Sequence, residues 1–448
     1  MTQTLTITDP RDGSAVGELA CATDQEVSAA VAAAHKAAPE WARTDPGERG
    51  ALVAAAAASL RDHVDRLTEL TTREMGKPED DARGGVEAGI GTLEQYAQLG
   101  PVHRGRALQG SWQATDLMVP QPRGVVAAIT PWNDPVAVPC GLLGAALVTG
   151  NTVLLKPSER TPHTGLELAR LLQQALPEGV LQVLVGDAAT GALLAGADVD
   201  VVAHVGSTRA GRAIAEATAR TGAKALLENG GNDPLVVDSD VDVAWAADQA
   251  ATGCFANAGQ ICTSVERVYV VEDVAEAFLE TLVEQADGRE IGPLVDERMR
   301  REVHEHVEDA VGLGATLLAG GVVPDGPGSH YPCTVLTGCD SRMRIMREET
   351  FGPTAPVQVV GSFGEALEHA CAGDHGLAAT VLTASMGHAQ QAWRELPVGT
   401  VKVNAVFGGA PGGAAQPRGR SGQGFGYGPE LLDEMTTTKV VHLGLPGS

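Results

Sequence analysis

Short apolar runs alternate with helical patterns between residues 124 and 229, and this alternation constrains the fold more than any other feature. Runs this short are typical of buried strands, and the stretches between them are long enough for helices. Strands and helices that alternate through short links predict a parallel, doubly wound sheet, which binds ligands at the carboxyl ends of its strands. We expect strands at 124–130, 151–156, 181–185, 200–205 and 224–227, and helices at 135–148, 161–176, 188–196 and 208–221.

Helical patterns also lie on both sides of this region. A second α/β region is expected after Gly231, with helices at 241–257, 273–284 and 297–312. Three helical stretches come earlier, from Asp24 to about Trp41, from Glu48 to Met75 and from Asp80 to Leu99. Asp24 is a residue type that caps helix N-termini, and the glycine-rich segment 408–428 predicts a loop.

The 448-residue chain is acidic, with 57 Asp and Glu against 32 Lys and Arg and a net charge of −25. This charge disfavours nucleic acid and anionic membranes as partners, because both bind clusters of basic side chains. The N-terminus lacks the pattern of a signal peptide, and no apolar run reaches the roughly 18 residues that span a bilayer. Seven irregularly spaced cysteines indicate reduced thiols and a cytoplasmic protein, and no metal site is expected.

Two segments carry groups suited to covalent catalysis. The first is Phe255-Ala-Asn-Ala-Gly-Gln-Ile-Cys262, which ends in a cysteine, and the second is Leu227-Glu228-Asn-Gly-Gly231, which carries a carboxylate. A thiolate attacks a carbonyl carbon on the way to a thioester, and a carboxylate activates the water that releases the product. Most cysteines are small buried hydrophobic residues, so the residues alone leave both interpretations of Cys262 open.

Polar side chains follow two of the expected strands, at the ligand edge of the predicted sheet. Asn133 stands between a strand end and a helix start, so it either caps the helix or donates its amide to an oxyanion. Lys156 and Glu159 follow the next strand, either as two solvated charges or as partners of ribose hydroxyls. The sequence does not choose between these roles.

The segment Val205-Gly-Ser-Thr-Arg-Ala-Gly211 opens a helix, where free backbone N–H groups bind phosphate. It differs from a P-loop because Arg and Ala follow Gly211 in place of Lys and Ser or Thr, which excludes nucleoside triphosphate hydrolysis. No Gly-x-Gly-x-x-Gly motif follows a strand. Any dinucleotide site therefore differs from the usual Rossmann type.

The order of these motifs is more specific than any one of them. The order is Pro-Trp-Asn (131–133), Lys-Pro-Ser-Glu (156–159), Gly-Ser-Thr (206–208), Glu-x-Gly-Gly (228–231), Asn-x-Gly-Gln-x-Cys (257–262) and Glu-x-Phe-Gly-Pro (349–353). From about residue 8 to residue 442 the chain resembles the NAD(P)-dependent aldehyde dehydrogenase superfamily.

The resemblance implies an α/β fold with two Rossmann-like parallel-sheet domains and a small oligomerisation excursion. The implied parts are a dinucleotide-binding domain at 1–103 and 123–229, a catalytic domain at 230–435, and an oligomerisation element at 104–122 and 436–448. Relatives assemble as dimers or tetramers through such elements. Residues 436–443 have strand propensity and need a partner for their edge, so we expect a homodimer or homotetramer.

The resemblance also assigns roles to matching residues. Cys262 corresponds to the nucleophile, Asn133 with the Cys262 N–H to the oxyanion hole, and Glu228 to the base that activates water. The implied cofactor-binding residues are Lys156 and Glu159 at the adenine ribose, Ser207 at the pyrophosphate and Glu349 with Phe351 at the nicotinamide ribose. The same set includes Ile129, Thr130, Pro131, Trp132, Ser158, Gly186 and Gly206.

Two glutamates refine the expected activity. Glu159 would repel a 2′-phosphate, so we expect NAD⁺ in preference to NADP⁺. Relatives that pass the acyl group to coenzyme A typically lack a glutamate at the position of Glu228, so we expect release of a free acid. The alternatives are a coenzyme A-acylating aldehyde dehydrogenase and a catalytically silent scaffold of the same fold.

The expected substrate pocket departs from the family pattern. Asp134 and Gly141 stand where relatives often carry an aromatic or bulky residue, and the late Pro-Phe-Gly-Gly is replaced across 408–415. With Ile261 and Thr263 beside Cys262, these positions predict a small, polar or amine-bearing aldehyde. The alternative is that Asp134 points away and pairs with a surface cation such as Arg418 or Arg420, because an unpaired buried carboxylate is costly.

Overall fold

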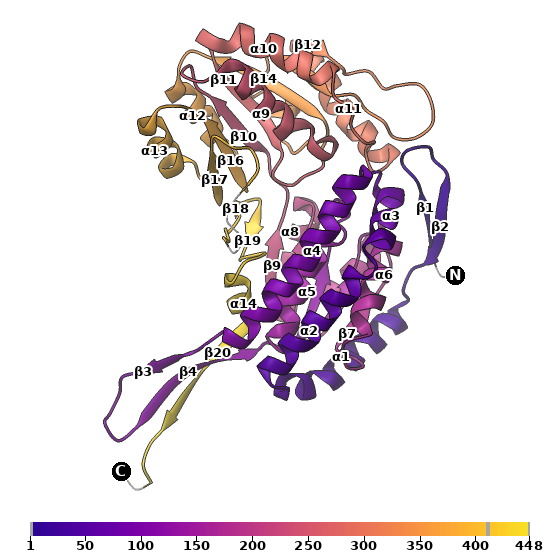
Figure 1. Ribbon diagram of the computed structural model, residues 1–448, viewed down its shortest axis with the longest axis vertical. Helices are drawn as coiled ribbons and strands as arrows, with labels where there is room; N and C mark the ends of the chain where they lie inside the picture. Colours follow the sequence, from indigo (N-terminus) through magenta and orange to yellow (C-terminus); the bar gives the residue numbers. More distant parts are fainter. Residues whose placement is uncertain (1–2, 409–412, 447–448) are drawn as a thin grey trace.

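The computed structural model describes residues 3–408 and 413–446, which form two α/β lobes and a projecting arm (Figure 1). The first lobe is built on a six-stranded sheet in the order β19-β9-β8-β5-β6-β7. All neighbours in this sheet are parallel except β19, which pairs antiparallel with β9. Its strands are β5 (Val125–Ile129), β6 (Thr152–Lys156), β7 (Leu181–Val183), β8 (Val201–Val205), β9 (Lys224–Glu228) and β19 (Gly422–Gln423).

Helices cover both faces of this sheet because alternate strand residues point to opposite sides. Val126, Ala128 and Leu155 pack against α2 (Pro46–Arg61), α4 (Glu79–Leu99), α5 (Ala137–Val148) and α6 (Pro162–Gln173). Val125, Ala127 and Leu154 pack against α1 (Asp24–Arg43), α7 (Ala188–Ala195) and α8 (Thr208–Thr221) on the other face. The doubly wound sheet predicted from the sequence is confirmed, with most element ends within two residues of the expected positions.

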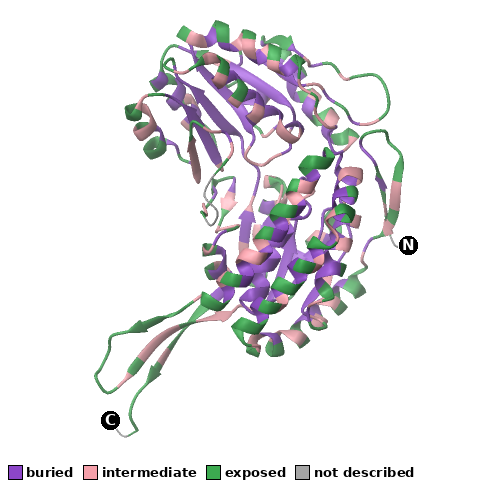
Figure 2. Cartoon of the chain, viewed as in Figure 1, coloured by how far each residue is buried: buried purple, intermediate pink, exposed green. Residues whose placement is uncertain are grey.

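The second lobe contains a seven-stranded sheet in the order β12-β13-β14-β11-β10-β16-β17, parallel except for β12. Its strands are β10 (Asp233–Val237), β11 (Val265–Val271), β12 (Thr316–Ala319), β13 (Thr334–Thr337), β14 (Thr354–Val360), β16 (Ala378–Leu382) and β17 (Thr400–Val403). Its helices are α9 (Val243–Phe255), α10 (Glu272–Asp287), α11 (Glu297–Gly312), α12 (Phe363–Cys371) and α13 (Met386–Glu395). Figure 2 shows both sheets as buried layers beneath partly exposed helices.

The arm consists of β3 (Arg106–Leu108), β4 (Thr115–Pro122) and β20 (Thr436–Leu443). The order is β20-β4-β3, and β20 pairs antiparallel with β4 along its whole length. The arm extends away from both lobes, and most of its residues are exposed or half-buried (Figure 1, Figure 2). Smaller elements are β1 (Thr4–Thr8), β2 (Ala15–Ala20), β15 (His375–Gly376), β18 (Arg418–Gly419) and α14 (Glu430–Glu434).

Three sequence expectations need correction. The stretch expected as one helix from Glu48 to Met75 is divided into α2 and α3 (Val64–Met75), with His63 between them bonded through Nδ1 to the Ser59 carbonyl. The cap of α1 is Thr23 and not Asp24, because Thr23 and Glu26 form a reciprocal capping box. The glycine-rich tail includes the short strands β18 and β19, while residues 409–412 of that tail lie outside the described residues.

The two sheets meet through opposite edges. β9 of the first sheet leads into β10 of the second through only four residues, 229–232. The carboxyl edge of the six-stranded sheet therefore faces the amino edge of the seven-stranded sheet. Within the described residues, no helix combines the length and the apolar character needed to cross a membrane.

Candidate active site

Cys262 lies on the loop that enters β11, at the amino edge of the second sheet. Three consecutive residues before it have left-handed backbone conformations, with φ of 49° at Asn257, 54° at Ala258 and 73° at Gly259. A Cβ at Gly259 would lie 2.1 Å from the Gly352 carbonyl oxygen, so only glycine fits there. The loop stores backbone strain at the position where it presents the thiol.

Gln260 holds this loop in place. Its Nε2 donates to the Asn257 carbonyl at 3.0 Å, and its Oε1 accepts from the Val295 N–H at 2.9 Å. Its carbonyl accepts from Asn133 Nδ2 and from Asn257 Nδ2, each at 3.1 Å. Asn133 follows β5 of the first sheet. Its hydrogen bond therefore links the two lobes, and its partner Gln260 is only two residues before Cys262.

The environment of Cys262 favours the protonated thiol. Burial is the largest cause, and the negative charges of Glu228, Asp233, Glu349 and Asp134 add to it, raising the pKa of the thiol to about 12. A nucleophilic role therefore needs a bound cation or a proton acceptor close to the sulfur. Glu228 is the first charge in this set and a candidate proton acceptor.

Glu228 is the last residue of β9 and half-buried. A Cβ at Gly426 would lie 2.0 Å from the Glu228 carboxyl carbon, so the glycine makes room for the carboxyl group. Burial raises the pKa of Glu228 to about 7, and a hydrogen bond from the Gly426 backbone opposes this increase. A carboxyl with a pKa near neutrality is suited to general base catalysis at physiological pH.

Glu349 and the glycines after Glu228 lie against each other. Glu349 Oε1 accepts from the Gly231 N–H at 3.1 Å, and a Cβ at Gly230 would lie 1.9 Å from Glu349 Oε2. Burial, with the nearby charge of Glu266, raises the pKa of Glu349 well above its usual value. The two predicted motifs, separated by more than a hundred residues, therefore lie in contact.

Phe351 is held in a left-handed conformation with φ of 54°. Its N–H and that of Thr350 donate to the buried Glu266 carboxylate at 2.9 and 2.6 Å. The Phe351 ring meets the Trp132 ring edge to face at a centroid distance of 5.4 Å. This ring pair joins the two sheet edges beside the cysteine loop.

Strand order spreads the other predicted cofactor residues along the carboxyl edge of the first sheet. Gly206 and Ser207 follow β8, Lys156 ends β6, and Gly186 follows β7 at the far side from Glu228. Lys156 Nζ donates to the Pro157 carbonyl at 2.9 Å and lies 3.8 Å from Glu159 Oε2. Ile129, Thr130 and Ser158 are buried on the same edge, whereas Pro131, Trp132 and Glu159 are half-buried.

The polar groups on this edge suit a long polar ligand. Ser207 caps α8 by accepting from the Ala210 N–H at 3.3 Å, so the helix N-terminus opens at the sheet edge. Among the described residues, Thr130 Oγ1 and Thr208 Oγ1 are buried without a hydrogen-bond partner. Buried polar atoms are nearly always paired, so unpaired ones along one edge fit the donor and acceptor needs of a dinucleotide.

The substrate side contains one correction. Asp134 pairs with a cation, but that cation is Lys77, whose Nζ lies 3.0 Å from Asp134 Oδ1. The surface partners proposed from the sequence are wrong, because Arg420 pairs with Asp374 at 2.8 Å and Arg418 lies exposed in β18. Gly141 is buried in α5, where a Cβ would meet only Thr92 Cγ2 at 4.0 Å, and Ile261 and Thr263 are half-buried beside Cys262.

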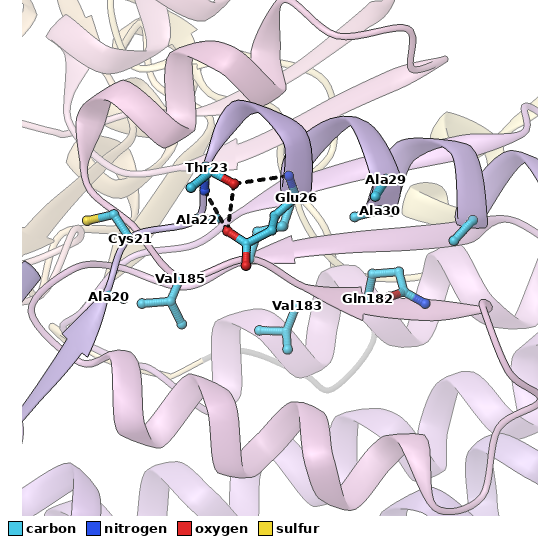
Figure 3. Close-up of a pocket in the computed structure, with 12 residues that line it drawn as sticks. Ala20, Cys21, Ala22, Thr23, Glu26, Ala29, Ala30, Gln182, Val183 and Val185 are labelled. Carbon is cyan, nitrogen blue, oxygen red and sulfur yellow. Dashed lines mark hydrogen bonds between the residues drawn. The ribbon is translucent and has the colours of Figure 1, made fainter. Parts of the chain in front are cut away.

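A cavity of about 630 Å³ lies elsewhere, between the start of α1 and the edge strand β7 (Figure 3). Its lining includes Cys21, Thr23, Glu26 and Gln182, and none of the predicted site residues. Among the described residues, no cluster of three or more His, Cys, Asp or Glu side chains could hold a metal ion.

Sequence reasoning did not assign four residues that shape the site, namely Lys77, His204, Glu266 and Gly426. Gln260 belongs to the cysteine motif that the sequence singled out. Its bonds to Asn257 and Val295, which hold the loop, became visible only in the structure. Lys77 ends a helical pattern and is 57 residues from Asp134, so nothing in the sequence linked the two.

Comparisons with known proteins identify the family of the chain. The model of the aldehyde dehydrogenase family matches residues 1–441. The chain is 36% identical to the α-ketoglutarate semialdehyde dehydrogenase of Haloferax volcanii, over 90% of this chain and 87% of that protein. It is 33% identical to the 3-sulfolactaldehyde dehydrogenase of Pseudomonas putida, over 99% and 94%.

Solved structures extend the likeness to three dimensions. The NAD-dependent aldehyde dehydrogenase from Sinorhizobium meliloti superposes with a TM-score of 0.96 at 33% identity, covering 100% of this chain and 92% of that one. The match includes both lobes and the arm, so it applies to the whole architecture. The chain therefore belongs to the aldehyde dehydrogenase family, whose members are oxidoreductases acting on aldehydes.

Proposed function

We propose that this protein oxidises a small polar aldehyde to the free carboxylic acid, with NAD⁺ as the electron acceptor. The observation that carries the proposal is the meeting of three groups from two sheets. The strained loop presents Cys262, the Asn133 amide lies against that loop at 3.1 Å from the Gln260 carbonyl, and Glu228 has a pKa raised to about 7. This set contains a nucleophile, an oxyanion donor and a base.

The residues act in two stages. Glu228 takes the thiol proton and passes it to solvent, and the Cys262 sulfur bonds to the aldehyde carbon. Asn133 Nδ2 and the Cys262 N–H donate to the oxygen that becomes anionic. The carbon–hydrogen bond then breaks, and the dinucleotide, when bound, would accept the hydrogen with its two electrons, so that the carbonyl re-forms and a thioester remains on Cys262. Glu228 then takes a proton from water, the hydroxide attacks the carbonyl carbon, and the carbon–sulfur bond breaks.

Most of the residues that would hold the cofactor lie on the first sheet edge, and Glu349 and Phe351 come from the second. Lys156 and Glu159 bind the ribose of the adenine half, and Ser207 with the N-terminus of α8 binds the pyrophosphate. Glu349 binds the second ribose, with Phe351 and Trp132 beside the nicotinamide. Glu159 repels a 2′-phosphate and favours NAD⁺ over NADP⁺, since like charges at about 4 Å repel by roughly 1 kcal/mol in water and more when partly buried.

The arm and the cysteines support two further assignments. The exposed strands β3 and β20 leave unpaired edges, which suits pairing with another copy of the chain as a homodimer or homotetramer. All seven cysteines are free thiols, in keeping with a reducing cytoplasm.

Intact-mass spectrometry tests the proposed reaction. Mixing the protein with an aldehyde and NAD⁺ should yield one carboxylic acid for each reduced cofactor, and the Glu228→Gln variant should accumulate a thioester on Cys262. Formation of acyl-coenzyme A after addition of coenzyme A would favour the acylating alternative. Dinucleotide binding without reduction by any aldehyde would instead indicate a silent scaffold.

A further inference from the structure

His306 is a buried residue of α11 that the proposed mechanism does not use. Its side chain is only 7% exposed, and both ring nitrogens have partners. Nδ1 lies 3.1 Å from Thr350 Oγ1, and Arg344 Nη2 lies 3.2 Å from Nε2. The histidine therefore links α11 to the segment that carries Glu349 and Phe351.

The arginine contact fixes which ring nitrogen carries the proton. A guanidinium group only donates hydrogen bonds, so Nε2 of His306 accepts from Arg344. The ring proton is then on Nδ1, which donates to the Thr350 hydroxyl oxygen. Burial, followed by the positive charge of Arg344, lowers the pKa of His306 to about 4. The ring therefore stays neutral and in this single tautomer at physiological pH.

Thr350 stands between two residues that the proposed function assigns to the cofactor, Glu349 before it and Phe351 after it. Its N–H donates to Glu266 Oε2 at 2.6 Å, and its hydroxyl oxygen is bonded to His306 Nδ1. Thr350 is buried, so bulk water does not replace the ring as a partner. The position of both cofactor residues depends on how this threonine is held.

The segment needs such restraints because its backbone is strained. Phe351 has a φ of 54°, a left-handed conformation that bulky residues rarely adopt and that persists only when surrounding contacts hold it. α11 contributes two of these contacts, the bond from His306 to Thr350 and the bond from the Arg344 N–H to Asp309 Oδ2 at 2.8 Å. Loss of the histidine bond would leave a buried hydroxyl without its partner and favour other arrangements of the segment.

We propose that His306 is a positioning residue, whose Nδ1–H holds Thr350 so that Glu349 and Phe351 keep the geometry that binds the nicotinamide half of the dinucleotide. This inference rests on the proposed function, because Glu349 and Phe351 are assigned to the cofactor there. His306 acts through Thr350 on the fraction of molecules whose segment is competent to bind, and cofactor affinity falls in proportion to that fraction.

Calorimetry with NAD⁺ and with AMP separates this role from a general loss of structure. AMP carries only the adenine half of the dinucleotide, which the first sheet edge is proposed to bind, so it serves as the reference. His306→Phe should raise the dissociation constant of NAD⁺ by about tenfold and leave that of AMP within about twofold. His306→Asn should restore NAD⁺ affinity, because its amide nitrogen is attached where Nδ1 is, whereas His306→Gln, whose amide nitrogen corresponds to Nε2, should not.

Two further variants complete the comparison. His304 lies on the same helix with its Nδ1 at 3.0 Å from Tyr331 Oη, so His304→Phe is the matched control and should leave both affinities unchanged. Thr350→Val removes the hydroxyl and keeps the N–H bond to Glu266, so it should weaken NAD⁺ binding as His306→Phe does, even if the phenylalanine variant fails to fold. The two changes combined should weaken binding no more than either alone, because both break one bond.

The outcomes separate the positioning role from the proposed function. Unchanged NAD⁺ affinity in His306→Phe and Thr350→Val, equal losses of NAD⁺ and AMP affinity, or rescue by His306→Gln but not by His306→Asn would overturn the positioning role. Failure of the unaltered protein to bind NAD⁺ would overturn both. NAD⁺ binding without oxidation of any aldehyde would overturn the proposed function alone, since the affinities still measure what His306 does.

Discussion

The two sheets contribute opposite edges to the proposed site, and the backbone conformations at these edges differ. The six-stranded sheet offers its carboxyl edge, where regular strand ends and the capped start of α8 leave polar groups unpaired. The seven-stranded sheet offers its amino edge, where Asn257, Ala258 and Phe351 adopt left-handed conformations that non-glycine residues rarely use. The first edge suits binding, and the second holds a nucleophile in a fixed and strained position.

This difference indicates that binding and bond-making can be altered separately. Parallel α/β sheets bind ligands at their carboxyl ends as a consequence of their topology, so the first edge needs few special residues. The second edge lacks that advantage and relies on Gly259, Gln260 and Glu266 to hold its loops. Variants on one edge should therefore leave the function of the other measurable.

The largest expected effect is the loss of the nucleophile. Cys262→Ala should lower turnover by about 10⁴-fold or more, because no other group forms the thioester. NAD⁺ affinity, measured by calorimetry, should change little, since the dinucleotide residues lie mainly on the other edge. Retained aldehyde oxidation in this variant would contradict the mechanism, and lost NAD⁺ binding would contradict the separation of the two edges.

The second largest effect is expected at Glu228, which ends a strand of the first sheet but is proposed to act on the thioester at Cys262 of the second. Glu228→Gln should slow steady-state turnover by about 10²–10⁴-fold while a first burst of reduced cofactor remains. Stopped-flow absorbance measures the burst. Glu266→Gln is the matched control, since Glu266 is also buried with a pKa raised to about 7 but holds the Phe351 loop. Its loss should weaken NAD⁺ binding without trapping a thioester.

The raised pKa of Glu228 also predicts a pH dependence. The ionised carboxylate is the base, so hydrolysis should increase with pH through about 7 and then level off. Between 4.5 and about 7 the folded protein retains a proton that the unfolded chain has released, so the free energy of unfolding should fall as pH rises. Glu228→Gln should remove the first trend and only weaken the second, because the pKa of Glu266 is also raised to about 7 and Glu266 keeps its own share of the stability trend. Profiles of rate against pH and denaturant titrations at several pH values measure the two trends.

Asn133 belongs to the first edge and Asn257 to the second, yet both donate to the Gln260 carbonyl at 3.1 Å. Comparing variants of the two residues therefore distinguishes a role in catalysis from support of the loop. Asn133→Ala should reduce kcat by about 10²–10³-fold if its amide serves the oxyanion. Asn257→Gly keeps the left-handed backbone and removes only the loop contact, so its loss should stay below about tenfold. Equal losses in the two variants would assign Asn133 to loop support alone.

The smallest expected effect concerns cofactor choice on the first edge. Glu159→Gln should raise the kcat/KM ratio of NADP⁺ to NAD⁺ by about tenfold, since it removes one charge repelled by a 2′-phosphate. Steady-state kinetics with both cofactors at fixed aldehyde measure this ratio. Equal efficiency with the two cofactors in the unaltered protein would show that Glu159 does not discriminate between them.

The strand ends were the most predictable part of the site. Asn133, Lys156, Gly206 and Glu228 each follow or end an apolar run, and parallel strands bring their carboxyl ends to one edge. The second sheet was harder to foresee, because its functional loops precede their strands and have no comparable rule. The sequence also did not predict that the second helical stretch is divided into α2 and α3, because the apolar pattern continues across Asp62 and His63.

The sequence by itself determined the family and the doubly wound sheet, and it predicted Cys262, Asn133 and Glu228 as the catalytic residues, because local patterns and motif order carry that information. Only the tertiary structure decided which side chains meet across the lobes. Lys77 reaches Asp134, Gly426 receives the Glu228 carboxyl, and Glu266 holds the Phe351 loop. Such contacts depend on burial and on how two sheets abut, and no spacing along the chain encodes them.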